Sequence, residues 1–262
     1  MKKHIPNIFT CLNLFCGCIA VIMIFRYKPQ NDPTNDLHYL EWAAYLVFLA
    51  AFFDFLDGFS ARALKVHSDM GLQLDSLADV ITFGFVPGAI VYQLLRMSDP
   101  SLIYANENFL RIFQFFPFII TVFSAYRLAK FNIDERQTES FIGLPTPANT
   151  LLIVALPLIL QHDTFHLTGL IRNPYFIIIL SVVMSYLLIA EIPLFSLKFK
   201  NFTWKQNRYQ YILLASSVIL LSVFFYVAIP LIILLYVFLA IIRNMEIAKR
   251  KRSNTQPIKN KI

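Results

Sequence analysis

The chain alternates between long apolar stretches and short polar connections. Most of the apolar stretches are about 17 to 24 residues long, and a helix of that length crosses a hydrocarbon core roughly 30 Å thick. Eight spans are predicted, at roughly 7–25, 40–60, 76–95, 109–129, 147–161, 174–190, 210–227 and 230–243. The pattern predicts an all-α, polytopic membrane helix bundle, because it lacks the short alternating segments of an outer-membrane barrel.

Two parts of this pattern need a further argument. The stretch 147–161 is short for a span and contains Pro157. The stretch 210–242 is continuously apolar and exceeds one span, so it is divided at Pro230, where a tight turn is expected because proline interrupts helices.

The composition agrees with a membrane protein. Hydrophobic residues make up 57% of the 262 residues, charged residues make up 15%, and the mean hydropathy is +0.60. A soluble domain of this size needs a larger polar share to cover its surface. No shift in composition marks a second domain, so residues 1–262 are interpreted as one integral membrane domain.

The distribution of positive charge predicts the orientation. The chain has 23 Lys and Arg residues. If the N-terminus is cytoplasmic, only five of them lie on the outer side of the membrane, namely Arg26, Lys28, Arg96, Arg111 and Arg172. Cytoplasmic loops carry the excess of positive charge, so both termini are expected inside. The basic tail 244–262 then lies against anionic headgroups of the bilayer, and no nucleic-acid partner is expected.

Four carboxylates occur where the second and third spans approach the cytoplasm. Asp54 and Asp57 close the second span, and Asp75 and Asp79 open the third. Residues three or four apart share a helix face, and a short connection makes the two helices antiparallel neighbours. All four acids are therefore expected to converge on one site.

Converging carboxylates repel one another strongly in a low dielectric. A membrane helix tolerates them when a cation lies between them, and intramembrane acids are candidates for a functional site. A set of oxygen ligands favours hard divalent cations. The expected cofactor is therefore Mg²⁺ or Mn²⁺.

Small residues and one cation accompany the acids. Gly58, Ala61 and Gly71 leave room for a ligand to approach the backbone. Arg62 lies one turn beyond Gly58, where its guanidinium can pair with a phosphate. This combination suits a pyrophosphate.

The order of these residues resembles the signature of the CDP-alcohol phosphatidyltransferase family. The matching string is Asp54-x2-Asp57-Gly58-x2-Ala61-Arg62-x8-Gly71-x3-Asp75-x3-Asp79. The resemblance implies a six-helix catalytic bundle within about residues 1–195, followed by two additional spans at about 209–243, and a homodimer. It also implies two metal ions held by the four aspartates, a CDP-lipid whose nucleotide lies near the small residues and Arg62, and Asp79 as general base.

Three further segments resemble the membrane-embedded phosphatidylserine synthase subgroup of this family. They are residues 5–17, 74–88 and 126–147. This resemblance implies CDP-diacylglycerol and L-serine as substrates, a cytoplasmic active site and, in a bacterium, the inner membrane.

Two sets of polar residues have both a functional and a structural interpretation. Arg127, Lys130 and Asn132 end the fourth span and are candidates for binding serine, although basic residues there also anchor a helix at the membrane surface. A second set recurs at i, i+3 and i+6 on the first span, and it either lines the nucleotide site or forms hydrogen bonds between helices. Its members are Asn7, Thr10 and Asn13.

Other functions remain open at this point. A sister transferase would use glycerol 3-phosphate or inositol phosphate, and a phosphorylated acceptor needs more basic residues around the acids. An ion-coupled transporter would place its carboxylates at the bilayer midplane between related halves. The four acids instead lie at one rim, and no internal repeat is visible.

Overall fold

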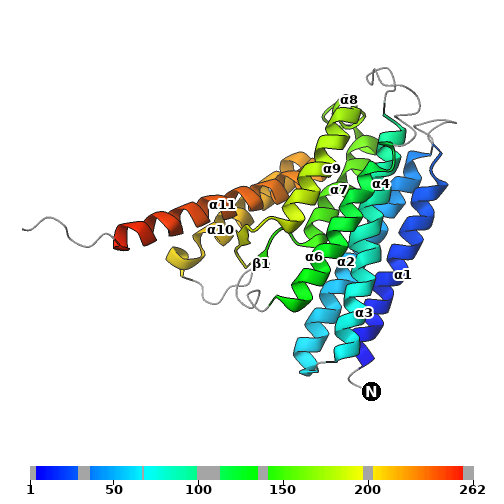
Figure 1. Ribbon diagram of the computed structural model, residues 1–262. Helices are drawn as coiled ribbons and strands as arrows, with labels where there is room; N and C mark the ends of the chain where they lie inside the picture. Colours follow the sequence, from blue (N-terminus) through cyan, green and yellow to red (C-terminus); the bar gives the residue numbers. More distant parts are fainter. Residues whose placement is uncertain are drawn as a thin grey trace, which may run out of the picture.

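A computed structural model describes residues 4–28, 36–66, 68–98, 113–134, 141–196 and 203–255. Most of these residues are helical, and the principal helices run side by side in one bundle (Figure 1). The long elements are α1 (Ile5–Arg26), α2 (Leu37–Leu64), α3 (Asp69–Asp79), η2 (Val80–Phe85), α4 (Val86–Arg96), α6 (Ile119–Ile133), α7 (Thr146–His162), α9 (Pro174–Ile189), α10 (Trp204–Phe224) and α11 (Ala228–Thr255). The helical membrane bundle predicted from the sequence is confirmed.

The described helices coincide with the predicted spans. Ile5–Arg26, Leu37–Leu64, Asp69–Arg96 and Gln206–Lys249 are long and apolar enough to cross a membrane, and α7 and α9 are apolar but shorter. The fourth span was predicted at 109–129, and its first residues lie outside the described part. In the described part, the 3-10 turn η4 (Phe116–Phe118) leads into α6, which continues to Ile133.

The third span contains a stretch of π-helix, η2, which connects α3 to α4 and was not predicted. A π-helical turn is wider than an α-helical one and often marks a functional site. Its carbonyl groups receive hydrogen bonds from neighbouring helices. Thr150 Oγ1 donates to the Phe83 carbonyl at 2.8 Å, and Thr121 Oγ1 donates to the Gly84 carbonyl at 3.0 Å.

A short strand pair determines how the chain enters α7. Strand β1 (Phe141–Ile142) pairs antiparallel with β2 (Pro193–Leu194), which follows α9. Gly143 between β1 and α7 has a φ of 76°, a conformation that glycine adopts without a steric penalty. The Leu144 amide then donates to the Leu187 carbonyl at 2.8 Å. The start of α7 is thereby held against the end of α9.

The last two helices form a hairpin that slants away from the rest of the bundle (Figure 1). They are joined by η6 (Phe225–Val227). The sequence analysis expected the turn at Pro230, which instead lies in the first turn of α11, just after η6. The Tyr226 ring stacks on His162, and its hydroxyl is 3.3 Å from the Tyr45 hydroxyl. These contacts attach the hairpin turn to α7 and α2.

Candidate active site

The acidic site lies where α2 ends and α3 begins. Lys65 ends α2 in the left-handed conformation, and the Ser68 side chain caps α3 by accepting a hydrogen bond from the Gly71 amide at 3.3 Å. A serine in this position satisfies an amide that the first turn of a helix leaves unpaired. The sequence analysis expected α2 and α3 to be neighbours, whereas the structure packs both of them against α1.

Three aspartates form a compact cluster, which we call the aspartate triad. Carboxylate oxygens of Asp54, Asp57 and Asp75 all lie within 4.8 Å of one another. Asp57 is buried, and the other two are partly buried. The buried Oδ1 of Asp75 has no hydrogen-bond partner among the described residues. An oxygen-only donor set with an unpaired buried oxygen fits a hard divalent cation.

Asp79 lies one helical turn beyond Asp75 and outside the aspartate triad. The residue is 8% exposed, and its charge interacts with those of all three triad members. Asn13 Nδ2 donates to its Oδ1 at 3.3 Å. Within the described residues, that contact occupies Oδ1 and leaves Oδ2 available for another partner.

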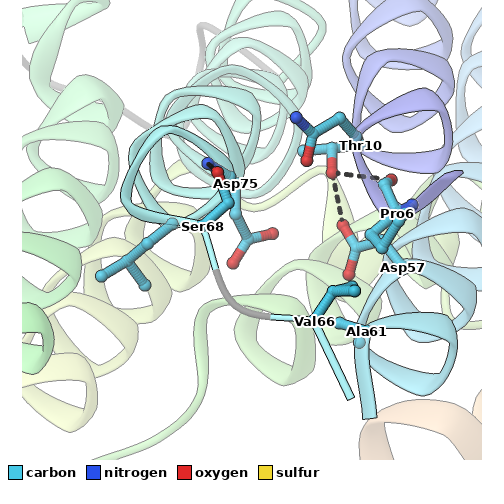
Figure 2. A pocket seen from close by; sticks show the side chains of 11 residues that line it. Pro6, Thr10, Asp57, Ala61, Val66, Ser68 and Asp75 are labelled. Atoms are coloured by element: carbon cyan, nitrogen blue, oxygen red, sulfur yellow. Dashed lines mark hydrogen bonds between the residues drawn. The ribbon is translucent and has the colours of Figure 1, made fainter. Parts of the chain in front are cut away.

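A pocket of about 170 Å³ opens beside the aspartate triad, between the beginning of α1, the end of α2 and the beginning of α3. Figure 2 shows the side chains of Asp57 and Asp75 on opposite sides of it. Thr10 Oγ1 donates to Asp57 Oδ2 at 2.9 Å and is also 3.2 Å from the Pro6 carbonyl. The lining residues are Pro6, Asn7, Thr10, Asp57, Gly58, Ala61, Val66, Ser68, Gly71, Leu72 and Asp75.

Most of the residues predicted to bind the nucleotide line this pocket: Asn7, Thr10, Gly58, Ala61 and Gly71. Asn7 Oδ1 lies 3.1 Å from the position that a Cβ at Gly71 would occupy, so a side chain there would crowd Asn7. Arg62 is exposed and folds back over Gly58, with Nη1 3.2 Å from the corresponding Cβ position. Asn13 lies beyond the pocket, on Asp79.

The three residues predicted to bind serine occupy different environments. Arg127 is buried and interacts electrostatically with Asp79. Lys130 pairs with Glu191 at 3.7 Å, and Asn132 Nδ2 donates to Ser76 Oγ at 2.8 Å. Of this set, Arg127 is the buried member.

The sequence analysis did not single out Pro6, Val66, Ser68 or Leu72, although all four line the pocket. For Ser68 a signal was present, because a serine directly before an acidic first helical residue is typical of a helix N-cap. The apolar members carry no comparable signal, since nothing in their type separates a pocket wall from a lipid-facing surface.

Comparisons with known proteins show the family of this chain. The family model described as CDP-alcohol phosphatidyltransferase matches residues 3–194. A Helicobacter pylori protein named CDP-diacylglycerol–serine O-phosphatidyltransferase is 33% identical over 183 residues, covering 68% of each chain. A Bacillus subtilis protein of the same name is 29% identical over 190 residues, 72% of this chain and 89% of the relative. A Saccharomyces cerevisiae protein of that name is 30% identical over 162 residues, 58% of this chain and 53% of the relative.

Proposed function

Because this chain belongs to the CDP-alcohol phosphatidyltransferase family, we propose that it transfers the phosphatidyl group of CDP-diacylglycerol to the hydroxyl of L-serine and releases CMP. The chain is therefore a membrane phosphotransferase. The acidic site with its adjacent pocket supports the donor half of this reaction. The acceptor half is supported by the relatives, which are named for serine.

The aspartate triad is the proposed metal site. Asp54, Asp57 and Asp75 would hold Mg²⁺ or Mn²⁺, and Asp79, whose charge interacts with theirs, would contribute to a second ion. A bound divalent cation neutralises pyrophosphate charge and stabilises the leaving CMP. The protein itself supplies the carboxylates, since the end of α2 and the beginning of α3 both pack against α1.

The pocket between α1, α2 and α3 is the proposed site of the cytidine diphosphate group. Its glycine and alanine floor lets the phosphates approach the backbone of α2 and α3. Asn7 and Thr10 supply polar groups along one wall. Arg62 would turn from Gly58 to a phosphate oxygen, because a guanidinium binds phosphate through two parallel hydrogen bonds.

Asp79 is the proposed general base. Asn13 holds its Oδ1, so Oδ2 is free to accept the proton of the serine hydroxyl. The serine oxygen then bonds to the phosphorus on the lipid side of the pyrophosphate. The bond from that phosphorus to the bridging oxygen breaks, and CMP leaves with the bond's electron pair.

Serine is a zwitterion, and its carboxylate needs a cation. Arg127 is the candidate that we favour, because it is buried and its charge interacts with that of Asp79. Lys130 already pairs with Glu191, and Asn132 bonds to Ser76 beside the triad. These two residues remain secondary candidates for the same role.

The proposal also includes the orientation. The acids and the beginning of α1 lie at the same end of the bundle (Figure 1), and the positive-inside rule assigns that end to the cytoplasm. A bacterial protein would lie in the inner membrane. A homodimer stays a prediction based on the family resemblance.

The product identifies the acceptor. Purified protein in detergent, given CDP-diacylglycerol, Mn²⁺ and labelled L-serine, should form labelled phosphatidylserine and one CMP per product. Asp79→Asn is the control for enzyme-dependent turnover. A protein that ignores serine and labels its lipid with glycerol 3-phosphate or inositol phosphate would be a sister transferase, and the serine proposal would be wrong.

A further inference from the structure

A second group of buried polar side chains lies apart from the aspartate triad. Each carries at least one polar atom without a hydrogen-bond partner among the described residues. These atoms are Ser124 Oγ, Arg127 Nε, Thr146 Oγ1, Asn149 Oδ1, Asn149 Nδ2 and Ser185 Oγ. Ser124, Thr146 and Asn149 are completely buried, and Arg127 is 7% exposed. Leaving a buried polar group unpaired costs free energy, so several at one place indicate a ligand.

Two members of this group, Ser124 and Arg127, belong to α6. The contacts of α6 with η2 place them at the level of Asp79. Ser124 packs on Gly84, where its Cβ lies 3.3 Å from the position a glycine Cβ would take. Arg127 is about one turn further along α6, toward the acids, and it interacts electrostatically with Asp79. The α6 members therefore flank the π-helix directly after Asp79.

Two further members, Thr146 and Asn149, belong to α7, which also contacts η2. The Thr150 hydroxyl bonds to the Phe83 carbonyl of η2 and lies 2.9 Å from the Thr146 carbonyl. Thr146, Asn149 and Thr150 are spaced so that they share one face of α7. Asn149 is thus presented toward the interior between η2 and its neighbouring helices, which agrees with its complete burial.

Ser185 of α9 completes the group. The hydrogen bond from the Leu144 amide to the Leu187 carbonyl joins the end of α9 to the segment that opens α7. Ser185 lies just before that contact on α9. Figure 1 shows α6, α7 and α9 as neighbours in the bundle. The unpaired atoms therefore come from three helices that contact one another.

We propose that Asn149, assisted by Thr146, binds the ammonium group of the amino-acid acceptor while Arg127 binds its carboxylate. This inference rests on the proposed function. Arg127 can only donate hydrogen bonds, whereas Asn149 Oδ1 and the hydroxyls of Thr146, Ser124 and Ser185 can accept them. An ammonium group brings three donors and no acceptor. Neutral acceptors suit it beside the acids, because they add no further negative charge.

The same arrangement would select the acceptor by its charged groups. With both charged ends of serine held between α6 and α7, the hydroxyl is the group left to face Asp79. An acceptor that lacks the ammonium would leave the Asn149 oxygen unpaired, and one that lacks the carboxylate would leave Arg127 unpaired. Sites built to hydrogen-bond a substrate group strongly reject analogues without it.

Asn149→Leu tests this assignment, because leucine has a similar size and no polar atom. The KM for L-serine should rise about ten- to a hundredfold, as expected for loss of one charge-assisted hydrogen bond. The KM for CDP-diacylglycerol should stay unchanged. 3-Hydroxypropanoate keeps the hydroxyl and carboxylate but has only hydrogen where serine carries the ammonium. Its KM should rise much less, so the preference for serine over this analogue should shrink.

Thr146→Val serves as a second, milder variant in case Asn149→Leu does not fold. Ser181→Ala is the matched control, because the Ser181 hydroxyl is buried in α9 but already bonds to the Ile177 carbonyl at 2.8 Å. Its serine KM should equal that of the unmodified protein. An unchanged serine KM in both test variants, or an equal rise for serine and 3-hydroxypropanoate, would overturn the assignment and leave bound water as the explanation of the unpaired atoms.

The two proposals fail in distinguishable ways. If the unmodified protein does not use serine, the proposed function and the ammonium site are both wrong. If it uses serine and the variants behave like Ser181→Ala, only the ammonium site is wrong.

Discussion

The site divides its four carboxylates between two environments, although all four belong to one sequence string. Asp54, Asp57 and Asp75 lie within 4.8 Å of one another, whereas Asp79 is held by Asn13 on the side of η2 and Arg127. Spacing alone predicted the convergence. It could not separate Asp79 from the others, because that separation depends on Asn13, which is 66 residues away.

Asp79→Asn should lower kcat about 10²- to 10⁴-fold, the range expected for loss of a general base. Asparagine keeps the size of the side chain but cannot accept the serine proton. The affinity for CDP-diacylglycerol should be nearly unchanged, because the base acts on the acceptor. Steady-state kinetics and CMP binding measure the two quantities. If binding and turnover fall together, Asp79 is chiefly a metal ligand.

Arg62→Lys should raise the KM for CDP-diacylglycerol about tenfold, because an ammonium cannot reproduce the two parallel hydrogen bonds of a guanidinium. Lys65→Arg is the matched control, since Lys65 lies in the same turn region but does not line the pocket. The serine KM should stay constant in both variants. An Arg62→Lys variant with unchanged kinetics would show that Arg62 remains on Gly58 during turnover.

Arg127→Ala should raise the KM for serine about ten- to a hundredfold, because removing the cation costs a charge-assisted hydrogen bond of roughly 1.5–3 kcal/mol. The KM for CDP-diacylglycerol should hardly change. Lys130→Ala provides the comparison, since Lys130 is partly exposed and pairs with Glu191. Loss of CDP-lipid affinity with a normal serine KM would instead assign Arg127 to the nucleotide or lipid.

At the scale of elements, hydropathy predicted the helices well because a spanning segment must be long and apolar. It could not predict η2 or the β1–β2 pair. The π-helical turn depends on hydroxyl donors from α6 and α7, and the strand pair joins segments about 50 residues apart. Both features depend on tertiary contacts, which a local pattern does not contain.

Thr150→Val should destabilise the protein by about 1–3 kcal/mol, because the Phe83 carbonyl would lose its donor in a buried, water-poor setting. Valine has nearly the same shape, so packing is preserved. Thermal unfolding in detergent measures the effect, and Ser181→Ala, whose hydroxyl bonds within its own helix, is the comparison. Equal midpoints for the two variants would mean that the π-helical carbonyl is satisfied in another way.

At the scale of the whole molecule, the acidic site without a cation destabilises the bundle, and a bound cation would stabilise it. Asp54 and Asp57 come from α2 and Asp75 from α3, and their mutual repulsion pushes apart two helices of the bundle core. A divalent ion would join the same two helices. Metal binding and the stability of the bundle are therefore coupled, since any ligand that binds only the folded state stabilises it.

Mg²⁺ or Mn²⁺ should raise the midpoint of thermal unfolding, and EDTA should lower it, without any substrate present. At a metal concentration of about 100 times the dissociation constant, the stabilisation is about 2.7 kcal/mol. For a chain of this size that corresponds to a shift of roughly 5–10 °C.

Asp75→Asn should unfold at a higher temperature than the unmodified protein in EDTA, because it removes repulsion between carboxylates. Its unfolding midpoint should rise little when metal is added. Asp69→Asn, which changes an acid outside the aspartate triad on the same helix, should respond like the unmodified protein. If Asp75→Asn gains as much from metal as Asp69→Asn does, the ion binds elsewhere and the aspartate triad is not its site.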